Sequence, residues 1–492
     1  MSNFKQFEKY VLLFLIMNFN DAFSQESWSK ILPNIGTLSS PRVTDLNNDG
    51  VGDIILGAGR YEFMACDSAV VALNGKNGDL LWKVKAKDQM FGSATLKDVN
   101  NDGVKDIFIG GRSAQLMAID GSTGKVIWKF KVPKNQKNQW FNFYNPQFIA
   151  DQNEDGFEDI IVSNGGDVNA APYDTDRPTG YLAIIDGENG DLISRAPMPD
   201  GKETYMSISV LPSESNTKKN IIYGTGGETV GGALFITSLE EVLKGDLSGS
   251  IKLDKSKSKG FVGTAVWVDI NMDRIPDIVT NSADGRLLAF DGKSYEKIWS
   301  VQIPNTEAYG AVAVGNFNGD LIPDFFVSYA EGVWPDLEWS KQIMVNGSNG
   351  VIEFEDSLGY YQMSSPVVAD VNNDGIDEAI ITMNYKETDK YFLTYYHVNL
   401  AIIDFTINEV RFWKVNYPGS NIASTPWIGD LNNNGFADII FVHGSNNRKV
   451  YKFDGVQVNR ILTGIPLSKK IKWGSYMGSN YDGVFEKLEG EN

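Results

Sequence analysis

The chain has 492 residues, of which 42% are hydrophobic and 22% are charged, a balance typical of folded proteins rather than disordered ones. Lysine and arginine total 44 against 63 aspartates and glutamates, so the formal net charge is −19 at pH 7. A surface this acidic repels phosphate backbones, and we expect no nucleic-acid partner. The single cysteine, Cys66, excludes an intrachain disulfide framework and a CxxC metal site.

The N-terminal residues have the pattern of a secretory signal peptide. Basic residues precede an unbroken apolar run over residues 10–17, which is too short to span a bilayer. Ala22 and Ser24 provide the small side chains that signal peptidase requires. We expect residues 1–24 to be removed and the remainder to be exported to the periplasm, the cell surface or the medium; a buried N-terminal helix is the alternative. No other apolar stretch approaches the length of a transmembrane segment, so we expect none.

An acidic pattern of the form D-x-N-x-D-G-x-x-D recurs along the chain, and such repeats indicate repeated structural units. The interval between the copies at residues 151 and 269 is about twice the usual spacing, which places a degenerate unit, without the acidic pattern, near residue 209. The eight units therefore begin near residues 45, 98, 151, 209, 269, 316, 370 and 430.

Each unit contains four short β-strands. An apolar strand precedes the acidic loop, and a β-rich strand such as residues 54–56 follows it. After a variable loop comes a hairpin, marked by Asn74-Gly75 in the first unit and Asp120-Gly121 in the second. These dipeptides indicate hairpin turns because both of their residues can adopt a positive φ. Trp82 and Trp128 fall on the last strands of these hairpins, where packing between neighbouring units is expected.

Repeated four-stranded units without long helices predict an all-β fold, a single β-propeller. We expect eight blades, with seven as the alternative, over residues 25–484, followed by a tail at 485–492. The segment from Trp28 to Leu32 has the pattern of a last strand without a preceding unit. We expect it to complete blade eight and close the ring, and residues 469–481 are the competing candidate for that position.

These repeats resemble two known propeller families. The acidic loops are similar to the calcium-binding loops of FG-GAP repeats, the integrin α-type and VCBS-like class. The Asn-Gly and Asp-Gly hairpins with their tryptophans resemble the tryptophan-docking motif of PQQ-like propeller repeats. Together the two patterns cover roughly residues 28–460. The resemblance implies a propeller with structural calcium, but it does not select a function, because such propellers include adhesion modules, lectins, assembly scaffolds and enzymes.

The acidic loops are the candidate metal sites. Side chains at positions 1, 3, 5 and 9 can converge on a cation, and an all-oxygen donor set favours Ca²⁺ over softer metals and over Mg²⁺. We expect five to seven structural Ca²⁺ ions, with metal-free Asx turns as the alternative, strongest for the loops at 316 and 430. The expected ligands are Asp45, Asn47, Asp49, Asp53, Asp98, Asn100, Asp102, Asp106, Asp151, Asn153, Asp155, Asp159, Asp269, Asn271, Asp273, Asp277, Asn316, Asn318, Asp320, Asp324, Asp370, Asn372, Asp374, Glu378, Asp430, Asn432, Asn434 and Asp438.

The loops on the opposite face vary in length and are rich in aromatic residues. Variable loops on a rigid scaffold are where binding residues usually lie, and exposed tyrosine and tryptophan suit a protein or sugar partner. The alternative is that these rings only hold the loops in place. The candidate ligand-binding residues are Trp140, Tyr144, Tyr173, Trp334 and Trp339.

The leading hypothesis is a monomeric, non-catalytic adhesion or binding module for an extracellular or envelope protein or glycan. The alternatives are a cell-envelope assembly scaffold, a carbohydrate-active enzyme similar to polysaccharide lyases, and a quinoprotein-like enzyme. A single cysteine cannot form the vicinal cysteine pair of many quinoproteins, so PQQ is not expected as a cofactor. No catalytic residue is assigned. A convergent polar cluster in a deep channel mouth would favour an enzyme, and a shallow aromatic surface would favour binding.

Overall fold

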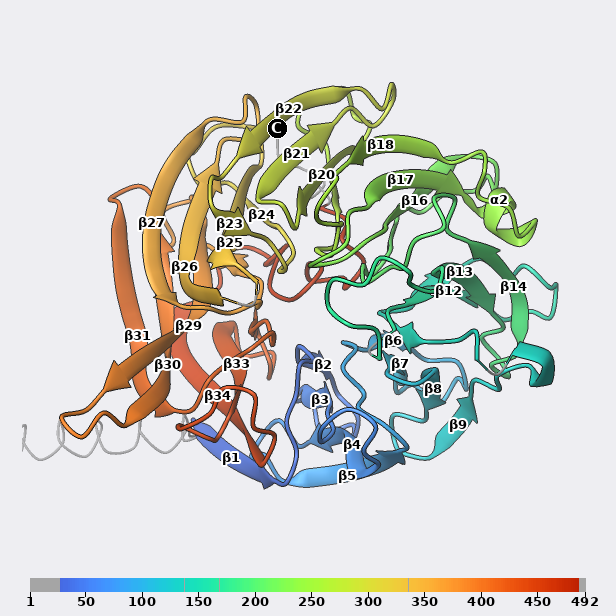
Figure 1. Cartoon of the computed structure of the whole chain (residues 1–492). Helices are drawn as coiled ribbons and strands as arrows, with labels where there is room; N and C mark the ends of the chain where they lie inside the picture. The colour runs from blue at the N-terminus through green and yellow to red at the C-terminus, as the bar shows by residue number, and fades with distance from the viewer. Residues whose placement is uncertain (1–26, 137, 168, 335, 486–492) are drawn as a thin grey trace, which may run out of the picture.

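The computed structural model describes residues 27–485 except 137, 168 and 335, so the expected signal peptide at 1–24 lies outside the described residues. The strands form sheets arranged in a ring around a central axis (Figure 1). This is an all-β propeller, and the predicted fold class is confirmed. Among the described residues, helical structure is limited to α2 (Leu239–Leu243) and the 3-10 turn η1 (Lys134–Gln136). No helix in this part of the chain is long and apolar enough to cross a membrane.

The described strands fall into eight groups, called blades one to eight in chain order. Within each blade the strands pair antiparallel, and from the centre outward they follow the sequence, except that the outermost strand of blade eight is the N-terminal β1. Blade one comprises β2 (Arg42–Thr44), β3 (Asp53–Gly57), β4 (Cys66–Leu73) and β5 (Leu80–Ala86). Blade two comprises β6 (Thr95–Lys97), β7 (Asp106–Gly111), β8 (Gln115–Ile119) and β9 (Val126–Lys129). Blade three comprises β10 (Asn142–Phe143), β11 (Gln147–Ile149), β12 (Asp159–Gly165), β13 (Tyr181–Ile185) and β14 (Leu192–Pro197). Blade four comprises β15 (Ser209–Val210), β16 (Lys219–Gly224), β17 (Ala233–Ser238) and β18 (Ile251–Lys255).

The second half of the ring has the same plan with longer strands. Blades six and seven share a nine-stranded sheet, because Tyr360 of β27 pairs with Asn384 of β29. Blade five comprises β19 (Val266–Val268), β20 (Asp277–Ser282), β21 (Arg286–Phe290) and β22 (Lys297–Gln302). Blade six comprises β23 (Thr306–Glu307), β24 (Ala313–Gly315), β25 (Asp324–Val333), β26 (Asp336–Val345) and β27 (Ile352–Tyr360). Blade seven comprises β28 (Val367–Ala369), β29 (Glu378–Thr388), β30 (Thr394–Asp404) and β31 (Glu409–Pro418). Blade eight comprises β32 (Trp427–Gly429), β33 (Phe436–Gly444), β34 (Gly455–Pro466) and β1 (Trp28–Pro33).

The hydrophobic pattern of a strand follows its position in the blade. All five residues of β3 are buried, because neighbouring blades cover both faces of a middle strand. The outermost strand β1 instead alternates between half-buried and exposed residues, since only one of its faces packs on the protein. The continuous apolar runs that follow the acidic loops are therefore the middle strands that form the core between blades.

The N-terminal strand closes the ring. Strand β1 pairs antiparallel with β34, with Trp28 opposite Arg460 and Pro33 opposite Gly455. Blade eight is thus built from both ends of the propeller, as the sequence predicts for residues 28–32. Figure 1 shows this junction, where the blue β1 lies beside the red β34.

The segment after β34 does not form a closing strand but lies in the centre of the ring (Figure 1). This central tail, residues 467–485, bonds to innermost strands on opposite sides of the ring. The carbonyl of Trp473 accepts from the Val368 amide of blade seven at 2.9 Å, and the carbonyl of Gly483 accepts from the Trp267 amide of blade five at 2.9 Å. The guanidinium of Arg42, buried in blade one, donates to the Ser475 hydroxyl at 2.7 Å.

Candidate functional site

In blades one, two, three, five and six, the ninth residue of the acidic loop ties the loop to the hairpin of its own blade. In blade one, Asp53 is fully buried; its Oδ2 accepts from the Leu46 amide and its Oδ1 from the Gly75 amide, both at 2.9 Å. The two motifs that recur in the sequence are thus parts of one structure on one face of the ring, called the loop face here. The same pair of bonds is made by Asp106, Asp159, Asp277 and Asp324.

Blades seven and eight replace the hairpin amide with side chains. In blade seven, Glu378 accepts from the Val371 amide at 2.8 Å and from Asn372 Nδ2 at 2.7 Å. In blade eight, Asp438 pairs with the Arg460 guanidinium, whose Nε lies 3.1 Å and Nη2 3.0 Å from Oδ1. Both side chains of this ion pair are buried, at 1% and 0% exposure.

Burial makes the ninth carboxyl group a weak acid. It raises the pKa of Asp53, Asp159 and Asp277 to about 6, and that of Asp324 to about 7, and the amide hydrogen bonds only partly oppose this. In blade seven, burial and the neighbouring carboxylates raise the pKa of Glu378 to about 8. A cation placed in the loop would favour the ionised form of these groups.

The other acidic side chains fold back on their own loop. Asp45 Oδ2 accepts from the Gly50 amide at 2.8 Å, and Asn47 Oδ1 accepts from the Asp49 amide at 3.0 Å. Gly50 has φ 79°, a left-handed conformation that glycine adopts without steric cost. These contacts close the acidic segment into a tight loop.

Two of these loops contain a buried carboxylate oxygen, Asp98 Oδ1 and Asp269 Oδ1, that has no hydrogen-bond partner among the described residues. The other oxygen of each carboxylate accepts from a loop amide at 3.0 Å, that of Gly103 for Asp98 and that of Arg274 for Asp269. Within the described residues, however, no three carboxylate, imidazole or thiolate groups are gathered as a ready metal site. Asparagine and main-chain oxygens would have to complete the coordination shell, as the acidic pattern predicts.

Hairpin side chains, which are not part of the acidic pattern, lie beside the acidic loops. Asn153 Nδ2 donates to Asp186 Oδ2 at 3.0 Å, and Asn271 Nδ2 donates to Asp291 Oδ2 at 3.0 Å. In blade six, Glu353 accepts from Asn318 at 3.3 Å. The Asn or Asp that precedes glycine in the hairpins was the available signal for most of these additional oxygen donors.

On the opposite face, called the variable face here, two of the expected ligand-binding aromatics are not exposed. Trp140 and Tyr144 are only 5% and 8% exposed. The Trp140 ring packs against Phe130 at 4.8 Å and Phe143 at 5.7 Å between centroids. The expectation that these two residues present a surface is therefore wrong: the end of the link between blades two and three that carries them packs into the core.

The other three expected aromatics are accessible on the variable face. Tyr173 is 63% and Trp339 54% exposed, and Trp334 is half-buried. The rings of Tyr173 and Trp334 meet edge to face at 6.1 Å, and the Tyr173 hydroxyl donates to the Trp334 carbonyl at 3.1 Å. A loop of blade three thus reaches a loop of blade six, across the intervening blades four and five.

A cavity of about 430 Å³ lies beside this contact. Its walls come from loops and links of blades three to six, all on the variable face. The lining residues are Tyr173, Thr175, Arg177, Gly201, Lys202, Glu203, Thr229, Val230, Gly231, Lys257, Ser258, Lys259 and Val333.

One ion pair forms part of the cavity wall. Arg177 Nη1 lies 3.0 and 3.3 Å from the two carboxylate oxygens of Glu203, and the side chains are 7% and 1% exposed. The same Nη1 donates to the Tyr205 hydroxyl at 3.0 Å, and that hydroxyl donates to Glu203 at 3.1 Å. Burial raises the pKa of Glu203 even though Arg177 opposes the shift.

A second carboxylate–cation–tyrosine group lies nearby, at the equivalent position of blade six. Lys259 Nζ pairs with Glu307 Oε1 at 2.5 Å, and the Tyr309 hydroxyl donates to the other oxygen of Glu307. The acidic and hairpin motifs of the sequence include neither group. The available signal was a Glu-x-Tyr tripeptide, at 203–205 and 307–309, just before the first main strand of each blade.

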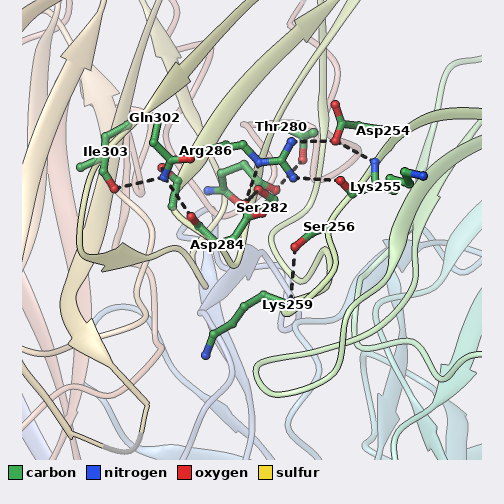
Figure 2. Close-up of polar contacts among 12 residues, drawn as sticks. Asp254, Lys255, Ser256, Lys259, Thr280, Ser282, Asp284, Arg286, Gln302 and Ile303 are labelled. Atoms are coloured by element: carbon green, nitrogen blue, oxygen red, sulfur yellow. Dashed lines mark hydrogen bonds and ion pairs between the residues drawn. The ribbon is translucent and has the colours of Figure 1, made fainter. Parts of the chain in front are cut away.

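A polar network holds the lysine-bearing segment of the cavity wall (Figure 2). Arg286 of β21 donates to Asp254 Oδ1 at 2.7 Å and to Asp284 Oδ1 at 2.8 Å, and Lys297 also pairs with Asp254. The Lys259 amide donates to the Ser256 hydroxyl oxygen at 3.3 Å, while the Lys259 side chain extends away from this network. The network joins blades four and five and fixes the segment that carries Lys259.

The ring of sheets defines the protein as a β-propeller. A family model described as FAM234A/B beta-propeller matches residues 28–375, and the chain belongs to this family. A search among curated proteins gives no match.

Solved propellers share the fold at low sequence identity. BamB from Moraxella catarrhalis is similar at 12% identity and TM-score 0.50, over 88% of this chain and 98% of that one. Quinohemoprotein alcohol dehydrogenase ADHIIG from Pseudomonas putida HK5 is similar at 13% and TM-score 0.54, over 90% and 77%. A europium-containing methanol dehydrogenase is similar at 13% and TM-score 0.56, over 88% and 92%. Identities this low establish a common fold and leave function open.

Proposed function

We propose that this propeller is an exported binding module whose variable face takes a protein or a glycan and whose acidic loops hold structural calcium. The observation that carries the proposal is the contact between Tyr173 and Trp334 beside the cavity. The contact joins loops of two blades that are not neighbours, between residues 161 apart in sequence. Packing of neighbouring blades does not require such a contact. Export rests on the signal-peptide pattern of residues 1–24.

The variable face has the composition of a recognition surface. Tyr173 and Trp339 expose more than half of their surface, and large, rigid aromatic side chains contribute much of the energy of protein and sugar recognition. A cavity of about 430 Å³ falls within the usual range of ligand sites, about 300–1,000 Å³. These features support a binding role at this face.

The acidic loops are proposed as calcium sites of the FG-GAP type. The residues at positions 1, 3, 5 and 9 would supply the oxygens, joined by hairpin residues such as Asp186 and Asp291. Ca²⁺ would supply positive charge to neighbouring carboxylates and would satisfy the buried orphan oxygens of Asp98 and Asp269. This role is structural, because the loops lie on the face opposite the cavity.

A second candidate function is a carbohydrate-active enzyme that uses the same cavity. The observation that favours it is the pair of buried carboxylate–tyrosine groups, Glu203 with Tyr205 and Glu307 with Tyr309. Both carboxylates are held in ion pairs, by Arg177 and Lys259, which suits positioning better than proton transfer. Binding is therefore the first choice, and release of new reducing or unsaturated ends from a bound glycan would support the enzyme instead.

The test is a glycan-array and pull-down screen with the calcium-loaded mature chain, followed by affinity measurement for any partner found. Tyr173→Ala and Trp339→Ala should each weaken binding about tenfold, because exposed aromatic anchors carry much of the binding energy. The control is Leu321→Ala, a side chain 73% exposed in an acidic loop on the loop face, which should leave affinity unchanged. Parent-like binding by both aromatic variants would show that the partner binds elsewhere.

A further inference from the structure

A basic segment forms one wall of the cavity in an otherwise acidic protein. Residues 255–259 alternate lysine and serine, and the chain as a whole has 63 acidic residues against 44 basic ones. Lys257, Ser258 and Lys259 all line the cavity, directly after β18. The network around Arg286 fixes this segment to blade five (Figure 2).

The charges that line the cavity are mostly positive. Four cationic side chains, Arg177, Lys202, Lys257 and Lys259, line the cavity with one carboxylate, Glu203. Arg177 pairs with Glu203 and Lys259 pairs with Glu307, so Lys202 and Lys257 are the lining cations that no carboxylate of the described residues neutralises. Both oxygens of the Glu203 carboxylate are already engaged by Arg177. The Lys257 side chain is exposed, and among the described residues no partner engages its ammonium group. This ammonium is therefore free to bind a ligand.

The net charge of −19 does not cancel this local field. At physiological ionic strength the Debye length is about 8 Å, so acidic residues on distant blades are largely screened at the cavity. Two glutamates outside the lining set contact Lys259: the Glu307 carboxylate pairs with its Nζ at 2.5 Å, and the backbone carbonyl of Glu228 accepts from the same Nζ at 2.6 Å. The lining groups therefore set the preference of this cavity for ligand charge.

We infer that the cavity binds an anionic saccharide, a sugar that carries a carboxylate or sulfate group. The inference rests on the proposed binding function and specifies its ligand. The lysine wall would pair with the oxyanion, since charge-assisted hydrogen bonds are the stronger ones. The exposed Tyr173 ring offers a face for a sugar ring, and the hydroxyls of Thr175 and Ser258 offer further hydrogen bonds.

Isothermal titration of the calcium-loaded mature chain tests the inference with four probes: trigalacturonate, its fully methyl-esterified form, a sulfated galactan trisaccharide and inorganic sulfate. At least one acidic saccharide should bind at least tenfold more tightly than the uncharged ester. Separate titrations with the carboxylated and the sulfated sugar distinguish the two sources of negative charge. Inorganic sulfate should bind far more weakly than either, because it makes no contact through a sugar ring.

Three variants separate the site from general charge effects. Lys257→Gln should weaken binding of the acidic sugar about tenfold, through loss of one charge-assisted contact. Lys125→Gln, an exposed lysine in a hairpin on the loop face, is the matched control and should leave the affinity unchanged. Glu228→Gln should tighten binding of the acidic sugar, because it removes an opposing charge.

Equal affinity for the acid and its ester, or unchanged binding by Lys257→Gln, would overturn the inference. Binding of inorganic sulfate as tight as that of the sulfated sugar would overturn the saccharide part. If the array and pull-down instead give a neutral glycan or a protein whose binding depends on Tyr173, the binding module stands and the anionic ligand is wrong. The two proposals therefore fail by different results.

Discussion

The indole Nε1 of Trp28 donates a hydrogen bond to the carbonyl oxygen of Gly75 at 2.9 Å. This bond joins the last strand of blade eight to the hairpin of blade one, at the point where the ring closes. The same bond recurs between consecutive blades, from Trp82 to Gly121, Trp128 to Gly187 and Trp299 to Gly347, at 2.8 to 2.9 Å. Ring closure therefore uses the same contact that joins blades elsewhere.

We expect Trp28→Ala to lower the free energy of unfolding by about 2 kcal/mol, less than the 3–5 kcal/mol of a fully buried tryptophan, because Trp28 is only half-buried. Trp28→Phe should cost about 1 kcal/mol, the usual value of the lost hydrogen bond. Urea unfolding measures both. Trp339→Ala, which removes an exposed ring, is the control and should change stability little. A Trp28→Ala variant as stable as the parent would show that β1 does not fasten the ring.

The buried pair of Asp438 and Arg460 gives a second stability prediction. Arg460→Met should destabilise the protein by about 3–5 kcal/mol, because it leaves a buried carboxylate without its partner. The double variant Asp438→Leu with Arg460→Met should recover much of the loss, since it removes both charges. Thermal unfolding of the two variants decides this. A double variant less stable than the single one would mean that other contacts of Arg460, such as its bond to the Gly75 carbonyl, dominate.

Calcium removal tests the acidic loops. Elemental analysis of protein purified in millimolar calcium should give five to seven Ca²⁺ per chain, and two or fewer would contradict the metal sites. A chelator should lower the melting temperature markedly, because each site at 100-fold excess over its Kd adds about 2.7 kcal/mol. Asp102→Ala should lower the melting temperature of the calcium-loaded protein more than Asp320→Ala does, because the loop of Asp102 holds three carboxylates and that of Asp320 holds two. Equal melting with and without chelator would favour metal-free turns.

His443 makes stability depend on pH. Its side chain is 1% exposed, and its Nε2 has no hydrogen-bond partner in the part of the chain that the structure describes. Burial lowers its pKa from 6.5 to about 4. The folded protein thus favours the neutral ring, so this stability is present above pH 6.5 and is lost as the pH falls toward 4. At pH 5 this effect should lower the free energy of unfolding by about 2 kcal/mol. Urea unfolding at pH 7 and pH 5 measures the drop in stability, which should be smaller by that amount in His443→Gln than in the parent. An equal drop in both proteins would contradict the prediction.

The fold was predictable because its signals are local and repeated. Each acidic loop and each Asn-Gly or Asp-Gly turn is contained in a short stretch of sequence, so a spacing of about 50 residues was enough to identify the blades. The closing strand was predictable for the same reason, because Trp28 stands in the pattern of a last strand.

The site was less predictable because its contacts are tertiary. Whether a loop aromatic is exposed depends on what its loop packs against, and nothing local distinguishes buried Trp140 from exposed Trp339. The cavity wall pairs Arg177 with Glu203, 26 residues away, and its rim joins Tyr173 to Trp334, 161 residues away. Such pairs depend on how the blades are placed around the ring, which the repeat pattern alone does not give.

The central tail has a consequence for the shape of any bound polymer. Its contacts from Ser475 to Arg42 of blade one and from Gly483 to Trp267 of blade five place the tail between blades on opposite sides of the ring. A long polysaccharide cannot thread through an axis that is crossed in this way. It must lie flat over the variable face or insert one end, so the length of chain recognised is set by the loops around the mouth and not by the depth of the propeller.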